Sequence, residues 1–359
     1  MPEMKMPDQE GTAGRAPWWR RAAKRYGLDA MSAMALGLFS TLVIGVIMEQ
    51  LGRIPGLGML QDFAKVAKSE PVVGAGIGVA IAWGLKVVPL AIFTSAVVGA
   101  LGYGNGVGPL GAYIAAVIGA ELGNRIAGKT RLDIVLVPSV TLLSGGVVAL
   151  LLGPSILGAM RALQSLISTA TTLQPVPMGI LVAVVVGLAL TGPISSAALC
   201  AVVFKFSGEP DPGLLLAAGA ATVGCCAQMV GFAVASFPEN GVSGLIAQGL
   251  GTSMVQIPNI LRRPAILLPP TLAAAVLGPL ATTVLVIHNA GVEAGMGTSG
   301  LVGLLGVWSH MSGTEPALGL LGKLALMCVA LPAGLSLGFS IVLRRWGWIR
   351  PGDMTLPKL

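Results

Sequence analysis

The sequence predicts an all-α membrane protein that crosses the bilayer many times. Of its 359 residues, 54% are hydrophobic and only 10% are charged, whereas an average soluble domain has roughly 25% charged residues. Several stretches contain no Asp, Glu, Lys or Arg and are at least about as long as the 20 residues that a helix needs to cross the hydrocarbon core. An outer-membrane barrel would instead alternate apolar and polar residues in segments of about ten. The uncharged stretches are 87–120, 134–160, 162–204, 212–238, 264–292 and 324–343.

Basic and aromatic residues gather at both ends of the chain. Residues 1–29 carry several cations around Trp18 and Trp19, and residues 344–359 carry three arginines beside Trp346 and Trp348. Such clusters mark a membrane interface, and the positive-inside rule places both ends in the cytoplasm. We therefore predict a cytoplasmic tail over 1–29, a membrane domain over 30–343 and a second cytoplasmic tail over 344–359.

The crossings follow from the apolar stretches in chain order. Because both ends lie on one side, their number should be even, and we expect eight to ten. One element within 49–120 should be re-entrant or broken, because Arg125, Lys129 and Arg131 also indicate a cytoplasmic segment. The expected crossings are 30–48, two or more in 71–120, then 134–158, 177–204, 212–236, 264–288 and 316–343.

Composition also excludes several functions. The formal net charge of +7 arises largely in the two tails, which indicates contact with anionic lipid rather than with nucleic acid. The four cysteines lie in apolar runs without CxxC spacing, so we expect small buried hydrophobic residues. No phosphate-binding GxxxxGK[ST] motif, metal-ligand cluster or nucleophile triad can be assembled. We expect no cofactor, no metal and no catalysis by this chain alone.

An internal repeat marks the segments where function should concentrate. Gly249–Ser253 reads GLGTS, and Gly295–Ser299 reads GMGTS. In lipid, irregular backbone survives only where it contacts protein or lines a cavity. Glycine allows close backbone approach, and Thr and Ser offer short donors and acceptors. We interpret both segments as tips of re-entrant hairpins that bind a polar solute. The alternative is close helix packing through small residues.

Polar side chains accompany both tips. Gln256 and Asn259 are three residues apart, so they share one helix face, and His288 and Asn289 end an apolar run just before the second tip. Amide groups of this kind can donate to and accept from sugar hydroxyls. The predicted solute site consists of Gly251, Thr252, Ser253, Gln256, Asn259, His288, Asn289, Gly297, Thr298 and Ser299.

Three ionisable residues in apolar surroundings are candidates for gating or ion coupling, because an intramembrane charge is costly and usually functional. They are Lys86, Glu121 and Glu315. For Glu121 a structural alternative is an internal ion pair, since Asn124 and Arg125 follow within about one helical turn.

These motifs resemble a known family. Val137–Leu142 (VPSVTL), continuing to Leu152-Gly153-Pro154, is similar to enzyme IIC, the membrane subunit of the sugar phosphotransferase system. The segments around the two GxGTS tips resemble its stand-alone branch, which includes perfringolysin O regulator-like proteins. The resemblance spans roughly residues 30–343. It implies about ten transmembrane helices with two re-entrant hairpins, a homodimer in the bacterial inner membrane, and an elevator-like movement of one domain.

The chain departs from the family pattern in two respects. Sugar-transporting members carry a Gly-Ile-Thr-Glu-Pro motif, whereas this chain has Gly313-Thr314-Glu315-Pro316, one residue shorter. We also expect no attached IIA or IIB domain, so phosphorylation would require separate phosphocarrier proteins. At most, therefore, it would be the membrane subunit of a sugar phosphotransferase.

Two functions follow from these observations. The first is a transporter that moves a small polar, sugar-like solute by alternating access of the hairpin-bearing half. The second is a membrane-embedded sensor that binds such a solute and signals through a partner. The tails predicted at the two ends are too short to form a cytoplasmic signalling domain, and this favours transport.

Overall fold

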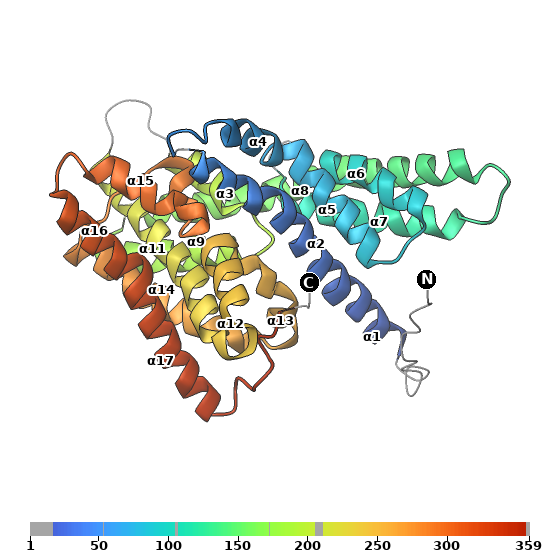
Figure 1. Cartoon of the computed structure of the whole chain (residues 1–359). Coiled ribbons are helices and arrows are strands. Elements are labelled where there is room, and N and C mark those ends of the chain that lie inside the picture. Colours follow the sequence, from blue (N-terminus) through green and yellow to red (C-terminus); the bar gives the residue numbers. More distant parts are fainter. Residues whose placement is uncertain (1–16, 53, 105–106, 172, 205–210, 357–359) are drawn as a thin grey trace.

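In the computed structural model, residues 17–52, 54–104, 107–171, 173–204 and 211–356 are described, and these residues form helices and no strand. The helices form two bundles, with the N-terminal helices running between them (Figure 1). The first bundle consists of α2 (Met31–Leu38), α5 (Glu70–Gly84), α6 (Pro89–Tyr103), α7 (Pro109–Ile126) and part of α8 (Asp133–Ala170). The second consists of α9 (Pro175–Thr191), α11 (Pro212–Ala235), α14 (Leu268–Pro279) and α17 (Leu331–Arg345).

Shorter elements connect these helices. Before α11 they are α1 (Trp18–Ala22), η2 (Ala23–Ala30), η3 (Phe39–Val43), α3 (Ile44–Leu51), α4 (Met59–Ala67) and α10 (Ser196–Val203). In the C-terminal half they are α12 (Phe237–Ile246), η4 (Ala247–Gly251), η5 (Ser253–Gln256), α13 (Ile257–Arg262), η6 (Pro264–Leu267), η7 (Leu280–Val284), η8 (Gly291–Gly295), η9 (Ser299–Leu301), α15 (Val302–Met311), α16 (Ala317–Ala325) and η10 (Leu326–Ala330).

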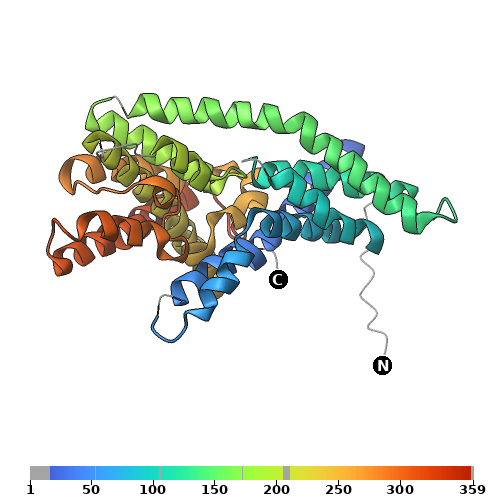
Figure 2. The ribbon, with the colours of Figure 1, turned by 90° about the horizontal axis from the view of Figure 1, so that it is seen from above.

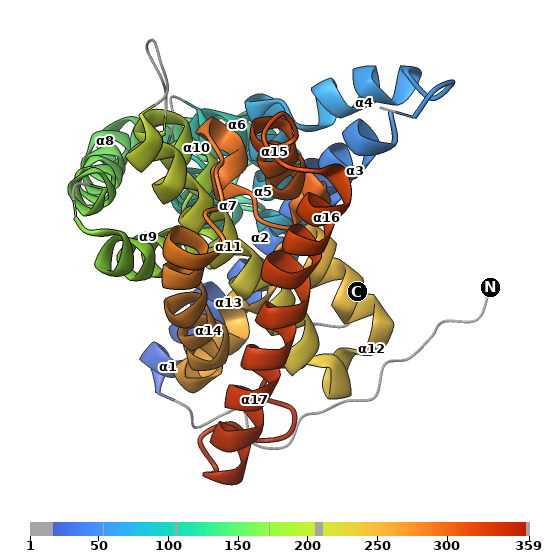
Figure 3. The ribbon, with the colours of Figure 1, turned by 90° about the vertical axis from the view of Figure 1, so that its left-hand side faces the viewer.

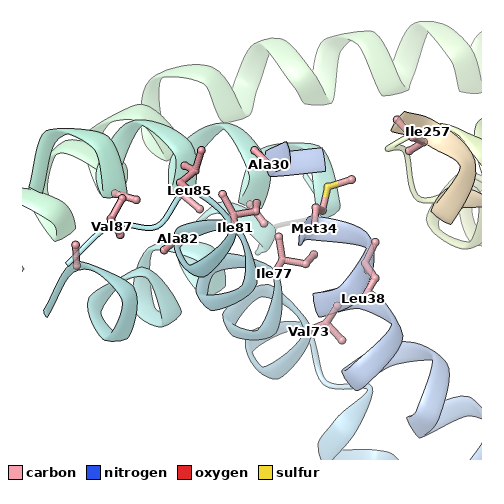
Figure 4. Close-up of a cluster of buried hydrophobic side chains, with 14 of the residues drawn as sticks. Ala30, Met34, Leu38, Val73, Ile77, Ile81, Ala82, Leu85, Val87 and Ile257 are labelled. Carbon is pink, nitrogen blue, oxygen red and sulfur yellow. The ribbon is translucent and has the colours of Figure 1, made fainter. Parts of the chain in front are cut away.

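Small and branched apolar residues hold the first bundle together. Met34 and Leu38 of α2 pack on Val73, Ile77 and Ile81 of α5 in one buried cluster (Figure 4). Helices α5 and α6 approach closely: a Cβ on Gly99 would collide with the carbonyl oxygen of Gly74. The absence of a side chain there allows backbone-to-backbone packing of the kind that joins helices in membranes.

Helix α11 forms the centre of the second bundle. Nearly all of its residues from Ala217 onward are buried, and α9, α14 and α17 surround it. Figure 3 shows α16 and α17 along the outer side of this bundle. A helix that is apolar on all faces belongs inside a protein or a membrane, and α11 is enclosed by its neighbours.

The lengths of the helices fit a polytopic membrane protein. Five helical segments are long and apolar enough to cross a bilayer: Ala23–Glu49, Asp133–Ala170, Pro212–Ala235, Pro264–Val284 and Ala317–Arg345. Three shorter apolar helices, α5, α6 and α9, accompany them. The prediction of an all-α multi-pass membrane protein is confirmed, and the number of about ten crossings stays a prediction.

Helix α8 connects the two bundles. It has 38 residues, contains Pro138 and Pro154, and runs along one side of both bundles (Figure 2). Its outer face is apolar: Leu150 and Leu151 are 77% and 71% exposed. Such a face suits lipid or another protein rather than water.

Both ends of the described chain lie on the same face of the molecule. Helix α1 begins at Trp18, within the predicted N-terminal tail, and η2 contributes Lys24 to a cavity. The segment after α17 folds back, and Thr355 and Leu356 line the same cavity. This arrangement suits the even number of crossings that the sequence predicts.

Candidate substrate site

The first GxGTS segment is the break in a helical hairpin. Helix α12 and η4 lead into it, Thr252 is extended with φ −158° and ψ 141°, and η5 and α13 lead away. The Thr252 hydroxyl accepts a hydrogen bond from the backbone N–H of Met254 at 3.2 Å, which caps the new helical turn. Gly241 interrupts α12 with φ 56° and ψ −152°, so the continuous arm before the tip is 242–251. An arm of that length is about 15 Å long, half of the roughly 30 Å hydrocarbon core.

The second segment breaks the chain more sharply. Gly297, Gly300 and Leu301 have positive φ values of 53°, 49° and 62°. A Cβ on Gly297 would come within 2.8 Å of the Cys225 backbone in α11, so only glycine fits both the dihedral angles and the space. The Ser196 hydroxyl at the start of α10 donates to the carbonyl of Gly295 at 2.7 Å and fixes the segment from its other side.

The two segments meet in space, although they are almost fifty residues apart in the sequence. The Thr298 hydroxyl donates a hydrogen bond of 2.5 Å to the carbonyl oxygen of Gly249. A Thr of the second repeat therefore binds the backbone of the first. The sequence predicts that both repeats contribute to one site, and the structure brings them together.

A narrow pocket lies where the tips meet the first bundle. Its volume, measured as the space open to the centre of a water molecule, is about 70 Å³; because one water needs about 10–15 Å³ on this measure, it holds roughly five waters. Both bundles and both tips line it. The lining residues are Leu38, Leu42, Val43, Tyr103, Pro109, Leu190, Ile194, Ser195, Ser196, Ala197, Gly251, Thr252, Met254, Met296 and Ser299.

A buried polar network lies beside the first tip, and sequence reasoning missed most of it. Ser253 and Thr191 share a hydrogen bond of 2.8 Å between their hydroxyls, and Thr191 donates to Gln228 Oε1 at 3.3 Å. Gln228 in turn donates to the Thr271 hydroxyl at 3.0 Å. One signal was available, because Gln228 is the only amide side chain in the uncharged stretch 212–238.

The two amides after the first tip bind the C-terminal segment. Gln256 Nε2 donates to the carbonyl of Met354 at 3.0 Å, and Asn259 Nδ2 donates to that of Thr355 at 2.9 Å. The two side chains also share a hydrogen bond of 2.7 Å, so they do share a face as predicted. Asn240 binds the same segment, and Met354 is fully buried. The amides therefore hold the chain's own backbone in this conformation.

The residues before the second tip have separate roles in the structure. Asn289 is fully buried and donates to the Thr222 hydroxyl at 2.7 Å and to the carbonyl of Gly303 at 3.1 Å. These bonds hold the irregular segment 285–290, in which Val286 has a positive φ of 44°, against α11 and α15. His288 is half-buried, and its backbone N–H lies 3.3 Å from the sulfur of Met311. Neither residue lines the pocket between the tips.

The three candidate gating residues lie away from this pocket. Glu121 pairs with Arg25 at 2.5 Å, a residue 96 positions earlier, rather than with Arg125. Glu315, in the turn between α15 and α16, pairs at 2.5 Å with Lys323 of α16. Lys86 is exposed in the turn between α5 and α6. Two of the three charges are therefore neutralised by partners.

Fold and site together define a membrane transport component, in which two broken helices meet at the junction of two helical bundles. A family described as "Phosphotransferase system, EIIC" matches residues 28–356, so the chain belongs to this family. Membership indicates a sugar as the substrate class and phosphocarrier proteins as partners. No curated protein and no solved structure matches the chain.

Proposed function

We propose that the chain is a sugar-type solute transporter whose binding site is the pocket between the two GxGTS tips. The observation that carries the proposal is the pocket's lining, which draws on both tips and both bundles. A site at the contact of two bundles is one that their relative movement can open to alternate sides. Thr252 and Ser299 supply hydroxyls, and Gly251 supplies accessible backbone.

The size of the pocket supports alternating access. Room for a handful of waters is too little for a sugar, so the bundles must separate for the solute to enter. The second bundle, with both broken segments, is the moving part in this proposal, and the first bundle with the outer face of α8 is the scaffold. We further propose that this apolar face joins two copies in a homodimer in a bacterial inner membrane, with both termini cytoplasmic.

Uptake into liposomes that hold only this protein tests transport. Radiolabelled sugars and related polar solutes are offered with and without sodium and proton gradients, and counterflow is measured alongside. Uptake of an unmodified solute that responds to a gradient shows a transporter that needs no phosphorylation. Binding without uptake contradicts autonomous transport; it points to the sensor function or to a requirement for separate phosphocarriers.

The site assignment has its own test with a matched control. Replacing Thr298 and Ser299 together with Ala removes the contact between the tips and one pocket hydroxyl, so solute binding should be lost while the protein still inserts. Ser309→Ala is the control, because that serine is exposed on α15 and bonds only within its own turn. Unchanged affinity in the double variant would place the solute elsewhere.

A further inference from the structure

A second cavity lies where the first and last described segments of the chain come together, and it is far larger than the pocket between the tips. Its volume on the same measure is about 660 Å³. Four separate parts of the chain line it: the N-terminal helix, the end of α5, α13 and the C-terminal segment. The first three contribute one cation each, namely Lys24, Lys86 and Arg262.

The charges around this cavity are unbalanced. Asp29 is the one acid among the lining residues, against three cations. Nearby acids are already engaged, since Glu121 pairs with Arg25 and Asp353 lies 3.6 Å from Arg263. Among the described residues, Lys24, Lys86 and Arg262 have no ion pair or side-chain hydrogen bond. The cavity therefore presents a net positive charge.

The backbone at Lys86 is unusual for a lysine. Helix α5 ends with the N–H of Val87 bonded to the carbonyl of Ala82 at 3.3 Å and the N–H of Lys86 bonded to that of Trp83 at 2.9 Å. This is the Schellman pattern, in which the residue at the position of Lys86 is usually glycine. Lys86 has φ 55° there. A lysine kept in a conformation that favours glycine is the kind of local strain that accumulates at functional sites.

The opposite wall is fixed. Thr355 and Leu356 line the cavity, and their segment is anchored by the hydrogen bonds from Asn240, Gln256 and Asn259. The buried side chain of Met354 anchors it further. Lys24, Lys86 and Arg262 are exposed, and they line one cavity whose opposite wall is held in place.

We propose that this cavity binds a phosphate group through Lys24, Lys86 and Arg262. Two ammonium groups and a guanidinium, with the hydroxyls of Ser32 and Thr355 beside them, match the several oxygens of a phosphate, and Arg can bind two of them at once. The phosphate belongs either to a soluble ester or to an anionic lipid headgroup. This site does not depend on the proposed solute pocket, with which it shares no lining residue.

The test uses the full chain purified in a neutral detergent, with inorganic phosphate as the probe and chloride at matched ionic strength as the reference. Phosphate should raise the unfolding midpoint and bind measurably by calorimetry, because a ligand selective for the native state stabilises it. Lys86→Gln and Arg262→Gln should each weaken phosphate binding by at least about tenfold. Lys129→Gln, an exposed lysine at the end of α7, should bind as the wild type does.

A second arm identifies the source of the phosphate. The protein is placed in nanodiscs of phosphatidylcholine alone or with phosphatidylglycerol. If phosphatidylglycerol weakens binding of inorganic phosphate in the wild type, the headgroup occupies the site; if affinity is equal in both discs, the ligand is soluble. Two results would overturn the proposal. One is that phosphate binds no better than chloride in either disc; the other is that the wild type, Lys86→Gln and Arg262→Gln bind phosphate with equal affinity. Lys86→Gly serves as a second variant in case Lys86→Gln misfolds. It also removes the ammonium group, but glycine adopts the positive φ at this position without strain.

Discussion

The turn at Lys86 allows the cost of a strained backbone to be measured apart from the loss of a charge. Lys86→Ala and Lys86→Gly both remove the ammonium, but only glycine adopts φ 55° without a steric penalty. For other residues the left-handed conformation costs roughly 1–2 kcal/mol. Glycine loses about 0.5–1 kcal/mol more backbone entropy than alanine on folding. The net advantage of Gly over Ala at this position should therefore be about 0.75 kcal/mol, from mean values of about 1.5 and about 0.75 kcal/mol.

The assay is thermal unfolding of the two variants in the same detergent at the same protein concentration. A difference of about 1 kcal/mol shifts the midpoint by about 2–4 °C in chains of 150–250 residues and by less in a longer one, so Lys86→Gly should unfold about 1–2 °C above Lys86→Ala. Phosphate must be absent, because it would stabilise a protein with an intact site. A glycine variant that unfolds at or below the alanine variant would refute the strain at this turn.

Three further substitutions test contacts around the tips and the C-terminal segment. Thr298→Val removes the hydroxyl that bonds the Gly249 carbonyl and should cost about 1–3 kcal/mol; an unchanged unfolding midpoint would show that this contact contributes little. Thr191→Val deprives two buried groups, on Ser253 and Gln228, of a shared partner and should cost a similar 1–3 kcal/mol or so, whereas Thr191→Ser should be nearly neutral. Met354→Ala should cost about 2–5 kcal/mol of packing and speed amide hydrogen exchange in residues 350–356; exchange at the wild-type rate would mean that the amide side chains alone hold the segment.

The sequence predicts the class of fold and the position of the broken segments well, because both depend on patterns of neighbouring residues. Uncharged runs define apolar helices, and a five-residue repeat identifies both tips. The repeat predicts that the two tips lie together. It does not predict the specific hydrogen bond from Thr298 to the Gly249 carbonyl. Gly297 has a positive φ, a conformation that glycine permits without steric cost.

Partners that are distant in sequence escaped prediction. In the sequence, Gln256 and Asn259 have no evident partner and are therefore candidates for binding a solute. In the structure they bind backbone carbonyls almost a hundred residues later. Every residue has a backbone carbonyl, so a residue pattern cannot identify such an acceptor. Glu121 has a plausible partner within a helical turn, whereas the fold supplies Arg25. In each case the tertiary fold determines the hydrogen-bond or ion-pair partner, and the spacing of residues in the sequence does not identify it.

The length of α8 has a consequence for the bilayer around the protein. Its 38 residues extend over about 57 Å, whereas the hydrocarbon core is only about 30 Å thick. The last ten residues are partly polar, with Arg161, Gln164, Ser165, Ser168 and Thr169. The uncharged part, residues 134–160, alone extends over about 40 Å. For this part to fit within the core, the helix must tilt by about 40° from the bilayer normal, about twice the usual average of about 20°. Lipids along α8 therefore meet a long, oblique apolar ridge instead of a helix that stands upright among them.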